Sequence, residues 1–128
     1  QIKSQANSAS HVPTFMMGAA RVALECEDAV EAFNRDYLKR REIMREGLSS
    51  LPGLRVPEPE GAFYVFADVT ETGMSAVEFA DGALEAGVQL IPASLITGGE
   101  GFVRISYATD EESIHEGLRR LRAWLIKE

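Results

Sequence analysis

Residues 101–109 read GFVRISYAT, and this stretch decides how the rest of the chain is arranged. Its alternation of residue types predicts a β-strand with two unlike faces. One face is apolar and consists of Val103, Ile105 and Tyr107. The other face consists of Phe102, Arg104, Ser106 and Ala108. A single cation is therefore expected among apolar and small neighbours on one side of a sheet.

Arg104 is the candidate binding residue of this strand. An arginine side chain is always charged and presents a planar fork of N–H donors. A guanidinium held partly away from water needs a planar anion, and a carboxylate matches it best. Two structural interpretations compete with a ligand role. Arg104 could be exposed at a sheet edge, or it could pair with an acid of the chain such as Asp68.

The composition argues against several classes of function. The chain has 128 residues, 45% of them hydrophobic, which suits one compact domain with its own core. The net charge of −7 argues against binding to nucleic acids and to anionic membrane surfaces. Cys26 is the single cysteine, which excludes an internal disulfide and fits a reducing cytoplasm. His11 and His115 lie far apart without ligands at metal-binding spacing, so no metal site is expected.

The order of helical and strand patterns predicts an α+β fold. Residues 13–26 and 28–50 have the pattern of two long helices, and residues 1–12 form a polar lead-in. Further strands are predicted at 54–56, 62–69, 88–91 and 102–108, with helices at 75–86 and from Thr109 onward. The expected architecture is a short mixed β-sheet covered by helices, with a long N-terminal helical pair, in one domain of residues 13–128.

Local signals refine these boundaries. Three pairs have the spacing of a helix-capping motif: Asp28 with Glu31, Ser75 with Glu78, and Thr109 with Glu112. The strand at 62–69 reads AFYVFADV and is apolar on both faces for most of its length. This segment is therefore predicted to be the central strand.

The first predicted helix, residues 13–26, is apolar on most of its faces. Such a helix is either packed on several sides or lacks its partner. In this chain it is expected to leave a large exposed apolar patch. Residues 1–27 are accordingly expected to self-associate or to be partly disordered.

Three motifs resemble one enzyme family when they are taken together. Residues 59–66 read PEGAFYVF, residues 85–88 read EAGV with Pro92 shortly after, and residues 102–109 read FVRISYAT. In this order and spacing they resemble the C-terminal third of a fold-type-I pyridoxal-phosphate aminotransferase of the aspartate aminotransferase class (class I/II). The polar segment 5–10 resembles the region just after that family's cofactor-binding half. The resemblance covers nearly all of the chain.

The resemblance implies roles for four residues. It assigns to Arg104 the binding of the α-carboxylate of the amino or 2-oxo acid. It places Phe63 near the substrate pocket, although core packing in a central strand explains this residue equally well. It places Asn7 and Ser8 in a segment that approaches the active site of a neighbouring subunit, which implies a homodimeric parent enzyme. No residue of the chain is expected to be catalytic.

The resemblance also implies pyridoxal 5'-phosphate as the cofactor of the complete enzyme. The chain has only three lysines, Lys3, Lys39 and Lys127. A Schiff-base lysine lies in a desolvated pocket, and none of these three has such a setting. The resemblance places the catalytic lysine and the other cofactor-binding groups before Gln1. The chain alone is therefore expected neither to bind the cofactor covalently nor to transaminate, and its expected partners are a missing large domain and amino-acid and 2-oxo-acid substrates.

Two other functions remain open from the sequence. The chain could be a stand-alone, non-catalytic α+β module that binds amino acids through Arg104. It could also be a purely structural interaction domain, in which case replacing Arg104 would leave the turnover of a parent enzyme intact.

Overall fold

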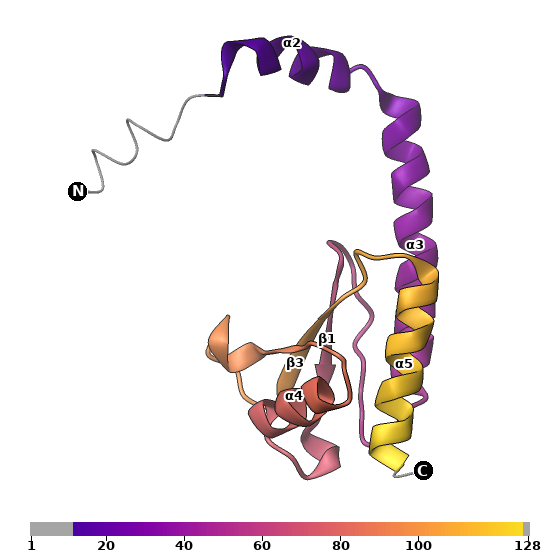
Figure 1. Ribbon diagram of the computed structural model, residues 1–128, viewed down its shortest axis with the longest axis vertical. Coiled ribbons are helices and arrows are strands. Elements are labelled where there is room, and N and C mark those ends of the chain that lie inside the picture. Colours follow the sequence, from indigo (N-terminus) through magenta and orange to yellow (C-terminus); the bar gives the residue numbers. More distant parts are fainter. Residues whose placement is uncertain (1–11, 127–128) are drawn as a thin grey trace, which may run out of the picture. The chain divides into compact units, whose positions relative to one another are not determined.

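The computed structural model describes residues 12–126, and the chain divides into two compact units, Gln1–Asn34 and Arg35–Glu128 (Figure 1). The first unit contains α2 (Thr14–Ala23) and the start of α3 (Glu27–Ser49). No residue of α2 is buried, and Phe15 is 81% exposed. This exposure agrees with the predicted apolar patch, whose self-association stays a prediction.

The second unit contains the sheet and its covering helices. Its elements after α3 are β1 (Tyr64–Asp68), the short 3₁₀ helix η1 (Thr70–Thr72), α4 (Ala76–Glu85), β2 (Ile91–Pro92), the short 3₁₀ helix η2 (Ala93–Leu95), β3 (Phe102–Ser106) and α5 (Glu111–Ile126). The three strands lie in the order β1-β3-β2. The predicted α+β fold is confirmed.

Four details of the predicted sheet are wrong. Both strand pairs among the described residues are antiparallel, so the sheet is not mixed. The central strand is β3 and not the segment at 62–69, because β1 has only the isolated bridge between Arg55 and Asp68 on its other side. The segment predicted as a strand at 54–56 forms only this bridge. The strand predicted at 88–91 is shorter than expected, because β2 starts at Ile91.

The two faces of the sheet differ as the alternation predicted. The face toward the helices carries Val65, Ala67, Val103, Ile105 and Tyr107, and all five are buried. The other face carries Tyr64, Phe66, Phe102, Arg104 and Ser106, and none of these is buried. This second set of side chains is called the open face below.

The helix-capping signals are partly confirmed. Ser75 and Glu78 form a complete capping box: Ser75 N–H donates to the Glu78 carboxylate at 2.8 Å, and Glu78 N–H donates to Ser75 Oγ at 3.2 Å. The cap predicted at Thr109 and Glu112 is wrong. The cap is Asp110, directly before α5, which accepts from Ser113 N–H at 2.7 Å. Asp28 is also not a cap, because α3 already begins at Glu27.

The helices of the second unit form one core with the sheet. Buried residues of α3, α4 and α5 join the sheet in a single cluster. Trp124 of α5 packs edge-on against Phe79 of α4, with ring centroids 5.0 Å apart. The ion pair between Lys39 and Glu111, at 2.8 Å, ties α5 alongside α3 (Figure 1). Of the helices that the structure describes, none has the length and apolarity to cross a membrane.

Asp68 is the one buried acid among the described residues, and it is fully engaged. One carboxylate oxygen accepts from the Thr70 hydroxyl at 2.6 Å and from Thr70 N–H at 3.0 Å. The other oxygen accepts from the Arg55 guanidinium at 2.7 Å. The Thr70 hydroxyl first, and then Arg55, lower the pKa of Asp68 from 3.8 to about 2.

This lowered pKa predicts a pH-dependent contribution to folding. A carboxyl group with a lower pKa in the folded state stabilises the protein above its unfolded pKa, and the contribution is lost as the pH falls toward the folded value. We expect the difference in unfolding free energy between wild type and Asp68→Asn to shrink as the pH is lowered from about 5 to about 2. Urea denaturation at several pH values measures this difference. Glu116 also has a lowered pKa, of about 2, but its contribution is the same in both proteins and cancels in the difference of unfolding free energies. A difference that stays constant over this range would contradict the prediction.

Candidate functional site

Arg104 lies at the middle of the central strand, on the open face of the sheet. In the register of the sheet it stands opposite Phe66 of β1 and Ile91 of β2. Its guanidinium carbon lies 4.2 Å from the centroid of the Tyr64 ring, a cation–π contact. The central position excludes the interpretation of an arginine at a sheet edge.

Among residues 12–126, no acid lies within ion-pair distance of Arg104. Asp68, the acid that could have paired with it, is held by Arg55 and Thr70 instead. The structural ion pair that competed with a ligand role is therefore not formed. The Arg104 guanidinium is a partly buried cation whose donors are not used by any described acid.

A pocket of about 290 Å³ opens beside this cation. Besides Arg104 it is lined by Tyr64, Gln89, Ile91 and Ser106. No acid lines it, and three of these neighbours carry groups that can donate hydrogen bonds. The pocket therefore has the charge and the donors that suit a carboxylate.

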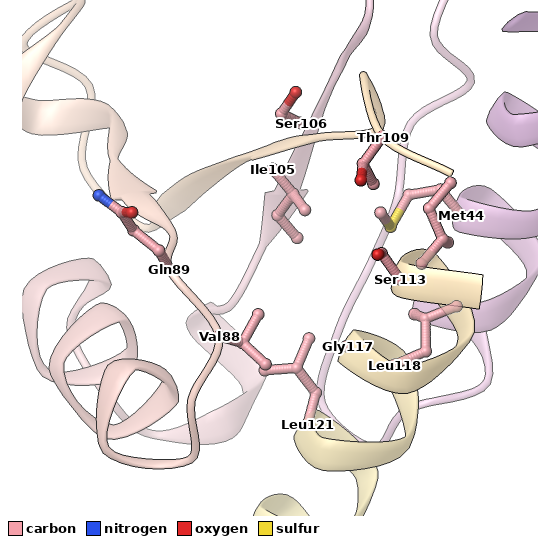
Figure 2. Close-up of a pocket in the computed structure, with 11 residues that line it drawn as sticks. Met44, Val88, Gln89, Ile105, Ser106, Thr109, Ser113, Gly117, Leu118 and Leu121 are labelled. Carbon is pink, nitrogen blue, oxygen red and sulfur yellow. The ribbon is translucent and has the colours of Figure 1, made fainter. Parts of the chain in front are cut away.

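A second pocket, of about 100 Å³, lies on the side of β3 that Ile105 faces (Figure 2). Its lining is mainly apolar and includes Met44, Val88, Leu118 and Leu121, and it contains no charged residue. In Figure 2, Ile105 points toward these side chains whereas Ser106 points to the other side of β3. This pocket does not suit an anion, whereas the Arg104 pocket does.

Phe63 lies near this site but does not line the pocket. Its ring centroid is 4.3 Å from that of Tyr64 and 6.4 Å from that of Tyr37, and the side chain is 40% exposed. Asn7 and Ser8, the other two candidates, lie outside the described residues. The structure thus brings Arg104 together with Tyr64, Gln89 and Ser106, which the sequence had not singled out as site residues.

The same alternation that predicted the faces of β3 could have found Tyr64. Tyr64 and Phe66 are two residues apart in β1 and share a face, and antiparallel pairing with β3 places that face beside Arg104. Gln89 had no such signal, because it lies in a segment without regular structure.

Lys39 does not have the setting of a cofactor-binding lysine. It is 65% exposed and pairs with Glu111 at 2.8 Å, on the charged surface of α3. The other two lysines, Lys3 and Lys127, lie outside the described residues. Within the described residues there is also no group of three His, Cys, Asp or Glu side chains that could hold a metal ion.

Comparison with known proteins identifies the family. The model of the family "Aminotransferase class I and II" matches residues 1–121. The chain belongs to this family. It is 42% identical over 116 residues to the aspartate aminotransferase of Pyrococcus horikoshii, which covers 87% of this chain and 30% of that protein. It is 38% identical to aromatic-amino-acid aminotransferase 2 of Thermococcus litoralis, over 94% of this chain and 32% of that protein.

Solved aminotransferase structures share the fold of this chain. The aromatic aminotransferase of Pyrococcus horikoshii superposes with a TM-score of 0.88 at 36% identity, over 98% of this chain and 35% of that one. The aspartate aminotransferase of Thermus thermophilus, solved with maleate, superposes with a TM-score of 0.81 at 34% identity, over 95% of this chain and 32% of that one. The predicted family resemblance is confirmed.

This aminotransferase chain spans about a third of the length of the relatives that it matches. The class I and II aminotransferases depend on pyridoxal phosphate. The described residues do not fit covalent attachment of this cofactor, because Lys39 is an exposed, ion-paired side chain.

Proposed function

We propose that this chain is the C-terminal, substrate-closing small domain of a pyridoxal-phosphate-dependent aminotransferase. The complete enzyme transfers an amino group between an α-amino acid and a 2-oxo acid, and Arg104 binds the α-carboxylate of either substrate. The observation that carries the proposal is the Arg104 guanidinium on the open face, which pairs with no acid among residues 12–126 and lies beside a pocket that no described acid lines.

The role of Arg104 in this proposal is to orient the substrate. A carboxylate that accepts two parallel N–H donors from one guanidinium is fixed in position and in plane. The bond from the substrate Cα to its hydrogen is then held in one direction, which accelerates the reaction by proximity and orientation. The Thermus thermophilus relative was solved with maleate, a dicarboxylate, which supports a carboxylate as the ligand.

The proposed partners are the remaining parts of the enzyme. The large domain would supply the Schiff-base lysine and the groups that hold pyridoxal phosphate, and the chain alone would be inactive. The exposed apolar side chains of α2 suit contact with that missing part. In a homodimeric parent, Asn7 and Ser8 would approach the active site of the neighbouring subunit.

Calorimetry on the 128-residue chain separates this proposal from a stand-alone amino-acid-binding module. Titration with maleate or a 2-oxo acid should show no binding stronger than about 1 mM, because an ion pair open to water contributes only about 0–1 kcal/mol. Reduction with borohydride in the presence of pyridoxal phosphate should leave no stoichiometric adduct. Micromolar binding of the carboxylates would instead support the autonomous module.

A further inference from the structure

The ring of Tyr64 reaches the Arg104 guanidinium because of the strand register. Two backbone hydrogen bonds mark the bonded pairs at the ends of the β1–β3 ladder. Tyr107 N–H donates to Phe63 O at 3.0 Å, and Val69 N–H donates to Gly101 O at 2.9 Å. Bonded and non-bonded pairs alternate in an antiparallel ladder, so the pairs formed by residues 64 and 106 and by residues 66 and 104 are non-bonded. Cross-strand side chains approach each other most closely at non-bonded pairs, which brings the diagonal neighbours Tyr64 and Arg104 within contact.

Tyr64 is itself held by a series of aromatic contacts that starts in the core. Its ring packs on Phe63 at 4.3 Å, and Phe63 packs on Tyr37 of α3 at 6.4 Å. Tyr37 lies 6.3 Å from the ring of Tyr107, which is 1% exposed. These contacts leave Tyr64 little freedom to turn away from Arg104.

The backbone before Tyr64 is also fixed. Ala62 has a φ of +60°, in the left-handed region that side chains other than glycine rarely adopt. Its carbonyl oxygen accepts a hydrogen bond from the buried Tyr107 hydroxyl at 2.9 Å. An unfavourable backbone conformation persists only when its surroundings hold it, and such positions cluster at functional sites.

We propose that Tyr64 is a positioning residue for Arg104, which rests on the proposed function of Arg104 as the carboxylate-binding group. The Tyr64 ring lies 4.2 Å from the guanidinium carbon and restricts the rotation of the guanidinium. No acid among residues 12–126 pairs with the N–H donors of Arg104, which leaves them to a carboxylate in the pocket. Tyr64 thus reduces the conformational entropy that Arg104 loses when a substrate binds.

The test uses the complete enzyme that carries this chain, with maleate as a competitive inhibitor against the amino acid. Tyr64→Leu removes the aromatic face, and we expect it to raise the KM of the amino acid and the inhibition constant of maleate about 3- to 20-fold. We expect kcat to change less than about twofold, because Tyr64→Leu leaves the Arg104 fork in place to orient a bound carboxylate and changes only the entropy that Arg104 loses on binding. Tyr64→Phe keeps the ring and should recover most of the lost affinity.

Phe66→Leu is the matched control. Phe66 is an aromatic residue on the same strand and the same face, directly opposite Arg104, but among the described residues its ring makes no cation–π contact with Arg104. We expect it to shift KM less than about twofold. Equal shifts for Phe66→Leu and Tyr64→Leu would overturn the proposal, as would a Tyr64→Phe variant as impaired as Tyr64→Leu.

A double-mutant cycle separates this proposal from the proposed function. If Tyr64 acts through Arg104, Tyr64→Leu should cause no further shift in the Arg104→Ala background, whereas an independent shift there would overturn the positioning role. If Arg104→Ala alone leaves KM unchanged, the proposed function itself fails. If Arg104→Ala raises KM and Tyr64→Leu does not, only the positioning role fails. Should Tyr64→Leu unfold in a thermal melt, Tyr64→Met, whose flexible side chain adapts better to the space left by the ring, provides the same comparison.

Discussion

Arg104→Ala is expected to lower kcat/KM of the complete enzyme by about 3 kcal/mol in transition-state terms, roughly 150-fold. The alanine variant removes both donors of the fork, and no other cation lines the pocket. A substrate carboxylate then has only neutral donors around it and is held neither in position nor in plane. Steady-state kinetics with an amino-acid donor and a 2-oxo-acid acceptor measure the effect.

Arg104→Lys tests whether the fork or only the charge matters. Lysine keeps the positive charge but cannot donate two parallel hydrogen bonds to a carboxylate, so we expect it to recover less than half of the lost transition-state free energy. Arg122→Ala is the matched control, because Arg122 is an exposed arginine of α5 and does not line the pocket. Turnover that survives Arg104→Ala would favour the structural interaction domain over the substrate-binding domain.

The alternation along β3 predicted correctly which of its residues are buried, because period-two patterning directly reports which side of a strand is in the core. The same reasoning misplaced β1. Its open-face residues Tyr64 and Phe66 are aromatic, so the pattern predicted that both faces of the segment are covered, as in a central strand. In the second unit Tyr64 is only half-buried and Phe66 is exposed. An apolar face of a strand predicts that other residues pack on it. It does not predict that the strand has a neighbouring strand on both sides.

The partners of the charged residues could not be predicted from the sequence. Arg55 and Asp68 are 13 residues apart, and they meet because a single bridge joins their backbones. The resulting ion pair with Arg55 engages the Asp68 carboxylate, so no described acid pairs with Arg104. The cation–π contact between Tyr64 and Arg104 depends likewise on the strand register, and a shift of the register by one residue would abolish this contact. The type of each residue was visible in the sequence, but the pairing that gives the site its chemistry is a tertiary property.

Phe79→Ala is expected to lower the free energy of unfolding by about 3–5 kcal/mol, which is the range for a fully buried phenylalanine. Phe79 is 0% exposed and supports α4 against Trp124 of α5, so alanine leaves a cavity between the two helices. Guanidinium denaturation followed by circular dichroism measures the loss. The variant should fold only if the free energy of unfolding of the second unit exceeds the loss caused by the substitution.

Val77→Ala provides the comparison for this change. Val77 lies in the same helix, two residues before Phe79, but it is 47% exposed, so its replacement should change the unfolding free energy by less than about 1 kcal/mol. A loss for Phe79→Ala as small as that for Val77→Ala would mean that α4 is not held against α5 in solution. Phe79 lies on the side of the sheet opposite Arg104. A Phe79→Leu enzyme that still folds should therefore keep its kcat/KM while its melting temperature falls, which separates the stability of the fold from the chemistry of the open face.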